Sequence, residues 1–204
     1  MQVRIFSSAF ALGILFLATS VFSQAPSDAA SKPEPLAMPW LDADREADER
    51  AALALSQLTQ EGKIQLVHGV ESFGARGPVE SNGGAGFVPG IPRLKLPALN
   101  MADSTVGVAL GAMRSRYSTL MPAVISEASA WNRQLSYGYG ALIGRELRAQ
   151  GYNVSLAGGA NLMREPRNGR TFEYRGEDPV LTGKLVAQAI RGLQDQHVIG
   201  DIKH

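Results

Sequence analysis

Three short apolar runs, separated by segments with helical spacing, constrain the fold of this 204-residue chain more than any other feature. The runs occupy residues 96–102, 153–157 and 198–202, and the helical segments occupy residues 129–150 and 178–193. Strands that alternate with helices of this length form βαβ units, in which the strands pair in parallel. The sequence therefore predicts an α/β fold with a parallel sheet.

The helical segments carry start and stop signals. The first segment is expected to end at Gly151, because glycine readily adopts the left-handed conformation found after helix C-termini. Asp178 and Pro179 suit the N-cap and the first position of the second segment. The buried face of the first segment is predicted to comprise Trp131, Leu135, Leu142, Ile143 and Leu147.

Helices and then a loop are expected before the first apolar run. A charged run at residues 42–50 merges into leucines with helical spacing, which favours a solvated amphipathic helix. Thr59 is the expected N-cap of a further helix that ends at Gly69. Residues 70–92 are rich in glycine and proline and are expected to form a loop.

The N-terminus has the composition of an export signal. Residues 1–23 join a positive start to an apolar stretch, which predicts a signal peptide cleaved before Gln24. A membrane anchor is the alternative, but polar residues interrupt the roughly 20 apolar residues that a span needs. Residues 24–39 contain four prolines and are expected to be a linker, so the folded domain would cover residues 40–204. We therefore expect an exported protein, periplasmic or extracellular, with no stable membrane insertion after cleavage.

Composition and motifs exclude several classes of function. Lys and Arg number 20 against 19 Asp and Glu, and the basic residues are scattered, so no nucleic-acid partner is predicted. The chain has no cysteine, which excludes thiol chemistry. His68, His197 and His204 lie far apart and glycine-rich phosphate-binding motifs are missing, so neither a metal site nor a cofactor is predicted.

Two hydrolytic arrangements have weak support. The sequence around Ser72 approaches the Gly-x-Ser-x-Gly elbow of serine hydrolases but lacks its first glycine. Glu173, Glu177 and Asp178 lie close together, and paired acids can act as general acid and base. The favoured interpretation of the last two is structural: Asp178 caps a helix, and Glu177 lies near the positive end of that helix.

The carboxyl ends of the predicted strands carry the remaining candidates, since such ends hold the chemistry in parallel α/β folds. They are Asp103, the loop at residues 161–174, and the pair Lys203 and His204. Within the loop, residues 170–174 combine an arginine, an acid and two aromatic rings. Such a set resembles a sugar-binding surface, because hydroxyls need polar partners and pyranose faces need apolar planes.

Several segments together resemble the N-terminal part of the family 3 glycoside hydrolases, which include β-glucosidases and β-xylosidases. The matching segments are residues 39–42, 63–69, 90–103, 153–157, 161–174, 176–179, 190–194 and 202–204. The resemblance implies roughly the first half of a TIM-type (β/α)8 barrel and a substrate with a terminal β-linked glucosyl or related sugar, small or oligomeric. It also implies that Asp103, Arg170, Lys203 and His204 bind that sugar.

The chain departs from the family pattern at two positions. Ser104 and Thr105 follow Asp103 where the family commonly has Gly-Pro, which bears on where the Asp103 carboxylate lies. Gly62 takes the place of the acid in the capping box that begins at Thr59.

The resemblance places no catalytic residue in this chain, because the family's nucleophilic aspartate and acid/base glutamate lie further on. We expect the N-terminal part of an exported retaining exo-β-glycosidase, inactive by itself and poorly stable. A non-catalytic carbohydrate-binding remnant is the main alternative. A structural domain without a ligand is the third.

Overall fold

A computed structural model describes residues 37–72, 77–109 and 117–204. The predicted signal peptide, and the predicted linker up to residue 36, lie outside the described residues. Helices and strands alternate along the described chain. The longer elements are α1 (Ala47–Ser56), α2 (Gln60–Val67), β1 (Gly86–Val88), β2 (Leu99–Asp103), α3 (Val124–Ala128), α4 (Arg133–Ala149), β3 (Val154–Gly159), α5 (Pro179–Gln194) and β4 (Ile199–Lys203). Short 3-10 turns are η1 (Pro39–Leu41), η3 (Val79–Ser81), η4 (Pro92–Leu94) and η5 (Thr171–Glu173).

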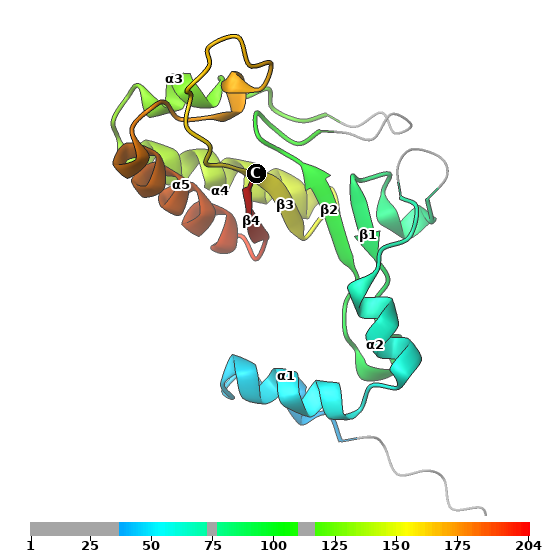
Figure 1. The fold of residues 1–204 in the computed structure, drawn as a ribbon. Coiled ribbons are helices and arrows are strands. Elements are labelled where there is room, and N and C mark those ends of the chain that lie inside the picture. The colour runs from blue at the N-terminus through cyan, green and yellow to red at the C-terminus, as the bar shows by residue number, and fades with distance from the viewer. Residues whose placement is uncertain (1–36, 73–76, 110–116) are drawn as a thin grey trace, which may run out of the picture. The chain divides into compact units, whose positions relative to one another are not determined.

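The strands form one four-stranded sheet in the order β1-β2-β3-β4 (Figure 1). Strands β2, β3 and β4 pair in parallel, as predicted from the three apolar runs. Strand β1 pairs antiparallel with β2, so the sheet is mixed. The prediction of a loop over residues 70–92 was wrong at β1. This strand has only three residues, and it forms because it pairs with β2 and buries Phe87 and Val88.

Small residues on β2, β3 and β4 face the two long helices. Ala102, Ser155 and Gly200 are in register across the three strands and form one row. Ala102 belongs to the core cluster that includes Tyr139 and Leu147 of α4. A Cβ atom at Gly200 would contact Ile190 of α5. Because side chains alternate along a strand, Asp103 points to the opposite face of the sheet.

Helix caps follow the predicted chemistry at most ends. The Thr59 hydroxyl accepts a hydrogen bond from Gly62 N at 3.1 Å, so this cap forms without an acid at position 62. Asp178 accepts from Leu181 N at 2.8 Å, and Gly151 has φ +84°. The predicted stop at Gly69 was wrong, because α2 ends at Val67 and the extended backbone of His68 breaks the helix.

The buried face of α4 differs from the predicted one at its start. Ile143 and Leu147 are buried as predicted, but Trp131 and Leu135 are 75% and 47% exposed. The helix begins at Arg133, with Asn132 as its N-cap, so Trp131 precedes it and has φ +51°. Tyr139, which was not predicted, occupies the buried face instead. Helix α3 was also not predicted, and at five residues it is too short to show a clear period.

Helices α4 and α5 touch through backbone at Gly140. A Cβ atom there would collide with the carbonyl oxygen of Ala189, whereas one at Gly138, two residues earlier on α4, would meet nothing within 4 Å. Gly140→Ala should therefore lower the free energy of unfolding by about 1–3 kcal/mol through overpacking. Gly138→Ala should raise it by about 0.5–1 kcal/mol, because alanine favours the helix. Urea unfolding measures both, and equal effects would contradict the close contact.

Candidate functional site

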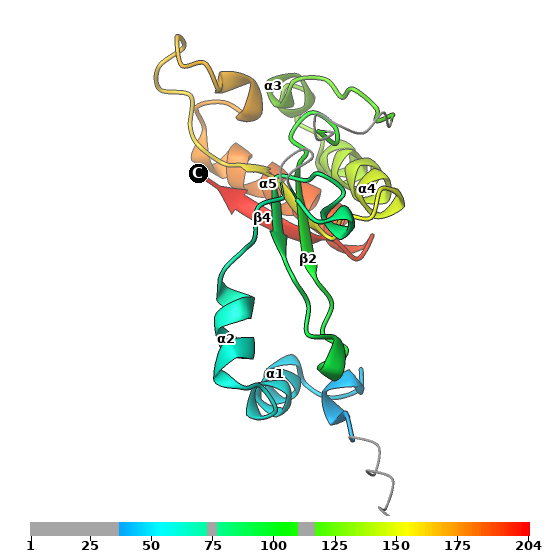
Figure 2. The same ribbon diagram turned by 90° about the vertical axis from the view of Figure 1, so that its right-hand side faces the viewer.

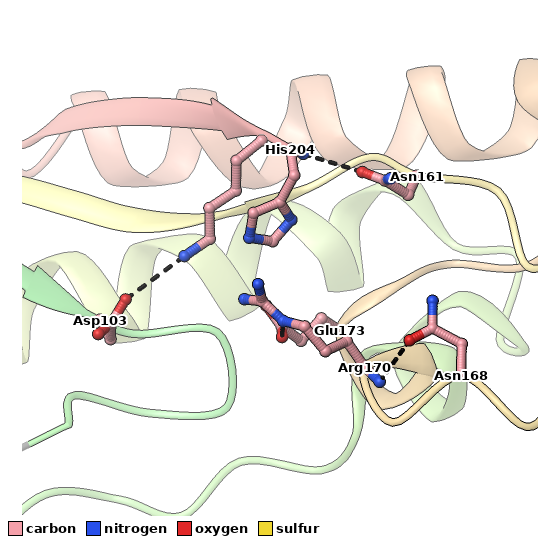
Figure 3. A network of polar contacts seen from close by, with 7 residues as sticks. Asp103, Asn161, Asn168, Arg170, Glu173 and His204 are labelled. Carbon is pink, nitrogen blue, oxygen red and sulfur yellow. Dashed lines mark hydrogen bonds and ion pairs between the residues drawn. The ribbon is translucent and has the colours of Figure 1, made fainter.

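The parallel strands bring Asp103 and Lys203 together across 100 residues of sequence. Asp103 ends β2 and Lys203 ends β4, with β3 between them. The Lys203 Nζ lies 3.4 Å from Asp103 Oδ1 (Figure 3). The Lys203 side chain is 16% exposed and that of Asp103 is 58% exposed, so the carboxylate keeps room for another partner.

Arg170 joins this site from the loop between β3 and α5. Both ribbon views show this loop beside α3 at the end of the sheet where the parallel strands finish (Figure 1; Figure 2). Asn168 accepts a hydrogen bond from Arg170 N at 3.0 Å. Arg170 Nε and Nη2 donate to the two carboxylate oxygens of Glu173 at 2.5 and 3.0 Å. Hydrogen bonding to Glu173 is the main cause that raises the pKa of Arg170, and the charge of Asp103 adds to it.

His204 lies beside these residues and is held by different partners. Its backbone N donates to Asn161 Oδ1 at 2.8 Å. Its ring stands edge-on to the ring of Tyr174, with 6.4 Å between the ring centroids. Figure 3 shows the imidazole pointing toward the side chain of Arg170. Sequence reasoning named the loop that begins at residue 161 but did not single out Asn161, which lies two residues after the end of β3.

An open cavity of about 260 Å³ lies among Asp103, Arg170 and Lys203. Three of the four predicted sugar ligands line it, and His204 does not. The half-exposed ring of Phe172 adds an apolar surface. The lining residues are Asp103, Ser104, Thr105, Val106, Gly107, Ala109, Arg170, Phe172, Glu173 and Lys203. The cavity thus combines a hydrogen-bond acceptor, two cationic donors and an apolar plane, which is what a ring with several hydroxyls requires.

The turn after Asp103 is supported despite its departure from the family pattern. Ser104 is buried, and its hydroxyl lies 2.8 Å from that of Ser155 on β3. The carbonyl of Asp103 accepts a hydrogen bond from Ala109 N at 2.7 Å. Ser104 therefore holds the turn against β3 through a side-chain contact that a glycine at this position could not make.

Two of the three acids considered for general acid and base chemistry, Asp178 and Glu173, have other partners. Asp178 caps α5, as the structural interpretation predicts. Glu177 is exposed immediately before this cap. The Glu173 side chain is 5% exposed and bound to Arg170. Within the described residues, no group of three His, Cys, Asp or Glu side chains is placed to hold a metal ion. Nor does this part of the chain contain a helix with the length and apolar content to span a membrane.

The comparisons with known proteins decide the family. Residues 84–204 match the family model described as the glycosyl hydrolase family 3 N terminal domain. The chain belongs to this family. It is 36% identical over 191 residues to "Probable beta-glucosidase A" of Aspergillus terreus, a match that covers 92% of the chain and 21% of the relative. It is 33% identical over 174 residues to a beta-glucosidase of Bacteroides ovatus, covering 81% of the chain and 22% of the relative.

Solved structures agree with this family membership. The structure of beta-glucosidase 3B from Thermotoga neapolitana in complex with glucose is 41% identical, with a TM-score of 0.68, and the match covers 74% of this chain and 22% of that one. The chain spans about a fifth of the length of the relatives it matches. Its α/β fold, with a mixed four-stranded sheet, therefore matches part of a family 3 N-terminal domain.

Two arginine–glutamate pairs in one loop provide a matched comparison. Arg170 binds a carboxylate that is 5% exposed, whereas Arg167 binds Glu165, whose carboxylate is 51% exposed. Removing the first cation leaves a buried charge without its partner, and exposed pairs contribute little. Arg170→Met should therefore lower the urea midpoint of unfolding, and Arg167→Met should leave it almost unchanged. Equal midpoints for the two variants would show that Glu173 is not held by Arg170.

Proposed function

We propose that this chain forms the part of an exported retaining β-glucosidase that binds the terminal, non-reducing β-linked glucosyl residue of the substrate. The observation that carries the proposal is the pairing of Lys203 with Asp103 beside Arg170 at one cavity. Relatives named as beta-glucosidases, one solved with glucose, support the sugar assignment.

Each side chain at the cavity has a role suited to hydroxyl groups. The exposed Asp103 carboxylate accepts hydrogen bonds from sugar hydroxyls, while Lys203 and Arg170 donate to the same ring. Phe172 offers an apolar surface to the less polar face of the pyranose. His204 does not line this cavity, and we keep it in the proposed subsite as a fourth ligand because it lies beside the cavity at the end of β4, next to Tyr174. A site built this way discriminates against analogues that lack a hydroxyl, because its polar groups would lose their partners.

The proposal assigns no nucleophile and no acid/base residue to this chain. Retention requires two carboxyl groups about 5–5.5 Å apart, one of which attacks the anomeric carbon while the other protonates the leaving oxygen. We assign both to sequence beyond His204, where further βα units would continue the sheet toward a (β/α)8 barrel. Residues 1–23 would direct export and residues 24–39 would link the signal to the domain, giving a periplasmic or extracellular enzyme.

The second candidate is a carbohydrate-binding remnant without catalysis, favoured by the lack of an unpaired acid at the cavity among the described residues. The coding frame after His204 separates the two candidates. A frame that continues to an aspartate followed by Trp or Tyr at a strand end supports the enzyme. A stop codon directly after His204 supports the remnant.

Activity of the intact gene product tests the sugar site. Asp103→Asn should lower kcat/KM for 4-nitrophenyl β-glucoside by about 10- to 100-fold, the range expected for a lost hydrogen bond to a charged group. Glu165→Gln, in the exposed part of the loop, is the control and should keep wild-type kcat/KM. A panel of nitrophenyl glycosides identifies the sugar. Unchanged kcat/KM in Asp103→Asn would instead favour a structural domain without this ligand.

A further inference from the structure

A buried ion pair lies between α3 and the end of the loop that carries Arg170, on residues that the proposed function does not use. Glu127 of α3 and Arg175, which follows η5, have side chains that are 2% and 5% exposed. Arg175 Nε lies 3.3 Å from Glu127 Oε2. Burying a single charge at this depth costs free energy, so each of the two charges is stabilised by the other. Burial lowers the pKa of Arg175, and the charge of Glu127 opposes that shift.

The pair joins four parts of the fold. The second carboxylate oxygen of Glu127 accepts a hydrogen bond from the hydroxyl of Ser136 on α4. Arg175 Nη1 donates to the carbonyl of Gly159 at the end of β3, at 3.2 Å. Tyr139 OH lies 3.0 Å from the carbonyl of Thr105, two residues after Asp103. Tyr139, Thr105 and Arg175 line the same small cavity. Burial is the main cause that raises the pKa of Tyr139; the charge of Glu127 adds to the shift and that of Arg175 opposes it.

The same region closes the loop that carries Arg170. Met163 N donates to the carbonyl of Gly176 at 3.0 Å, which ties the two ends of the loop together. The loop backbone also lies in close contact with β3, since a Cβ atom at Gly159 would collide with the carbonyl oxygen of Glu173. Arg175 thus sits at the neck of the loop, two residues after the acid that orients Arg170.

We propose that Glu127 and Arg175 are positioning residues, whose buried ion pair fixes the neck of the Arg170 loop against the end of β3. The pair thereby sets the distance between Arg170 and the turn after Asp103. Tyr139, which lines the same small cavity as Arg175, supports that turn through its hydrogen bond to the carbonyl of Thr105. This inference rests on the proposed function only where it concerns sugar binding. The anchoring of the loop can be measured without a sugar.

Hydrogen–deuterium exchange of the intact protein tests the anchoring. Glu127→Gln keeps the shape of the side chain but leaves Arg175 without a counter-charge. Amides in residues 163–176 should exchange at least about tenfold faster, because local opening of the loop becomes more frequent, while amides of α5 should not change. The control is Leu147→Ala, in the fully buried core of α4, which should lower the melting temperature without selective loosening of the loop.

Glucose inhibition tests the link to the sugar site. In Glu127→Gln the inhibition constant of glucose should rise about tenfold, and in Leu147→Ala, measured well below its melting temperature, it should not rise. Arg175→Lys provides a second variant, which keeps the charge but shortens the reach to Gly159, and should shift both quantities in the same direction.

Four results separate the two proposals. Wild-type loop exchange in Glu127→Gln and in Arg175→Lys would overturn the anchoring, and so would equal loosening of the loop in Leu147→Ala. Faster loop exchange with an unchanged glucose constant would confine the pair to a structural role and overturn positioning. Absence of glucose binding by the wild-type protein would overturn the proposed function, while the exchange comparison would still decide the anchoring.

Discussion

The row of small residues formed by Ala102, Ser155 and Gly200 determines how the rest of the structure is arranged. With little side-chain volume on that face, α4 and α5 approach the parallel strands closely and meet each other at Gly140 and Ala189. Strand alternation then places Asp103 and Lys203 on the opposite face, at the ends of β2 and β4. The candidate site thus depends on helix packing behind the sheet as much as on its own residues.

Much of the fold could be predicted from short-range signals in the sequence. The three apolar runs predicted the parallel strands, and the caps at Thr59 and Asp178 were predicted because each uses a side chain within three residues of its partner. Strand β1 could not be predicted, since a three-residue strand has no period and exists through pairing with β2. Trp131 was misplaced because an apolar residue directly before a helix fits the helical spacing while lying outside the helix.

The candidate site was likewise predictable only in part. The strand-end argument selected Asp103, the loop that carries Arg170, and the pair Lys203 and His204, and the resemblance to the family implied that all four bind one sugar. The structure lines the cavity with the first three and holds His204 beside Tyr174. No spacing in the sequence indicated the contact between Glu127 and Arg175, which are 48 positions apart, one on the short helix α3 and the other in the loop after η5. Long-range polar pairs of this kind leave no periodic signal, so three-dimensional coordinates are needed to find them.

Charge balance explains why this cavity suits a neutral ligand. Among the described residues, each cation that lines it has its own carboxylate, Glu173 for Arg170 and Asp103 for Lys203. An anionic substrate such as a phosphate ester would have to compete with both carboxylates for the cations. A sugar needs no net charge from its site, because hydroxyl groups donate to carboxylates and accept from cations at the same time. The paired charges therefore favour an uncharged ring with many hydroxyls, in agreement with the proposed glucosyl subsite.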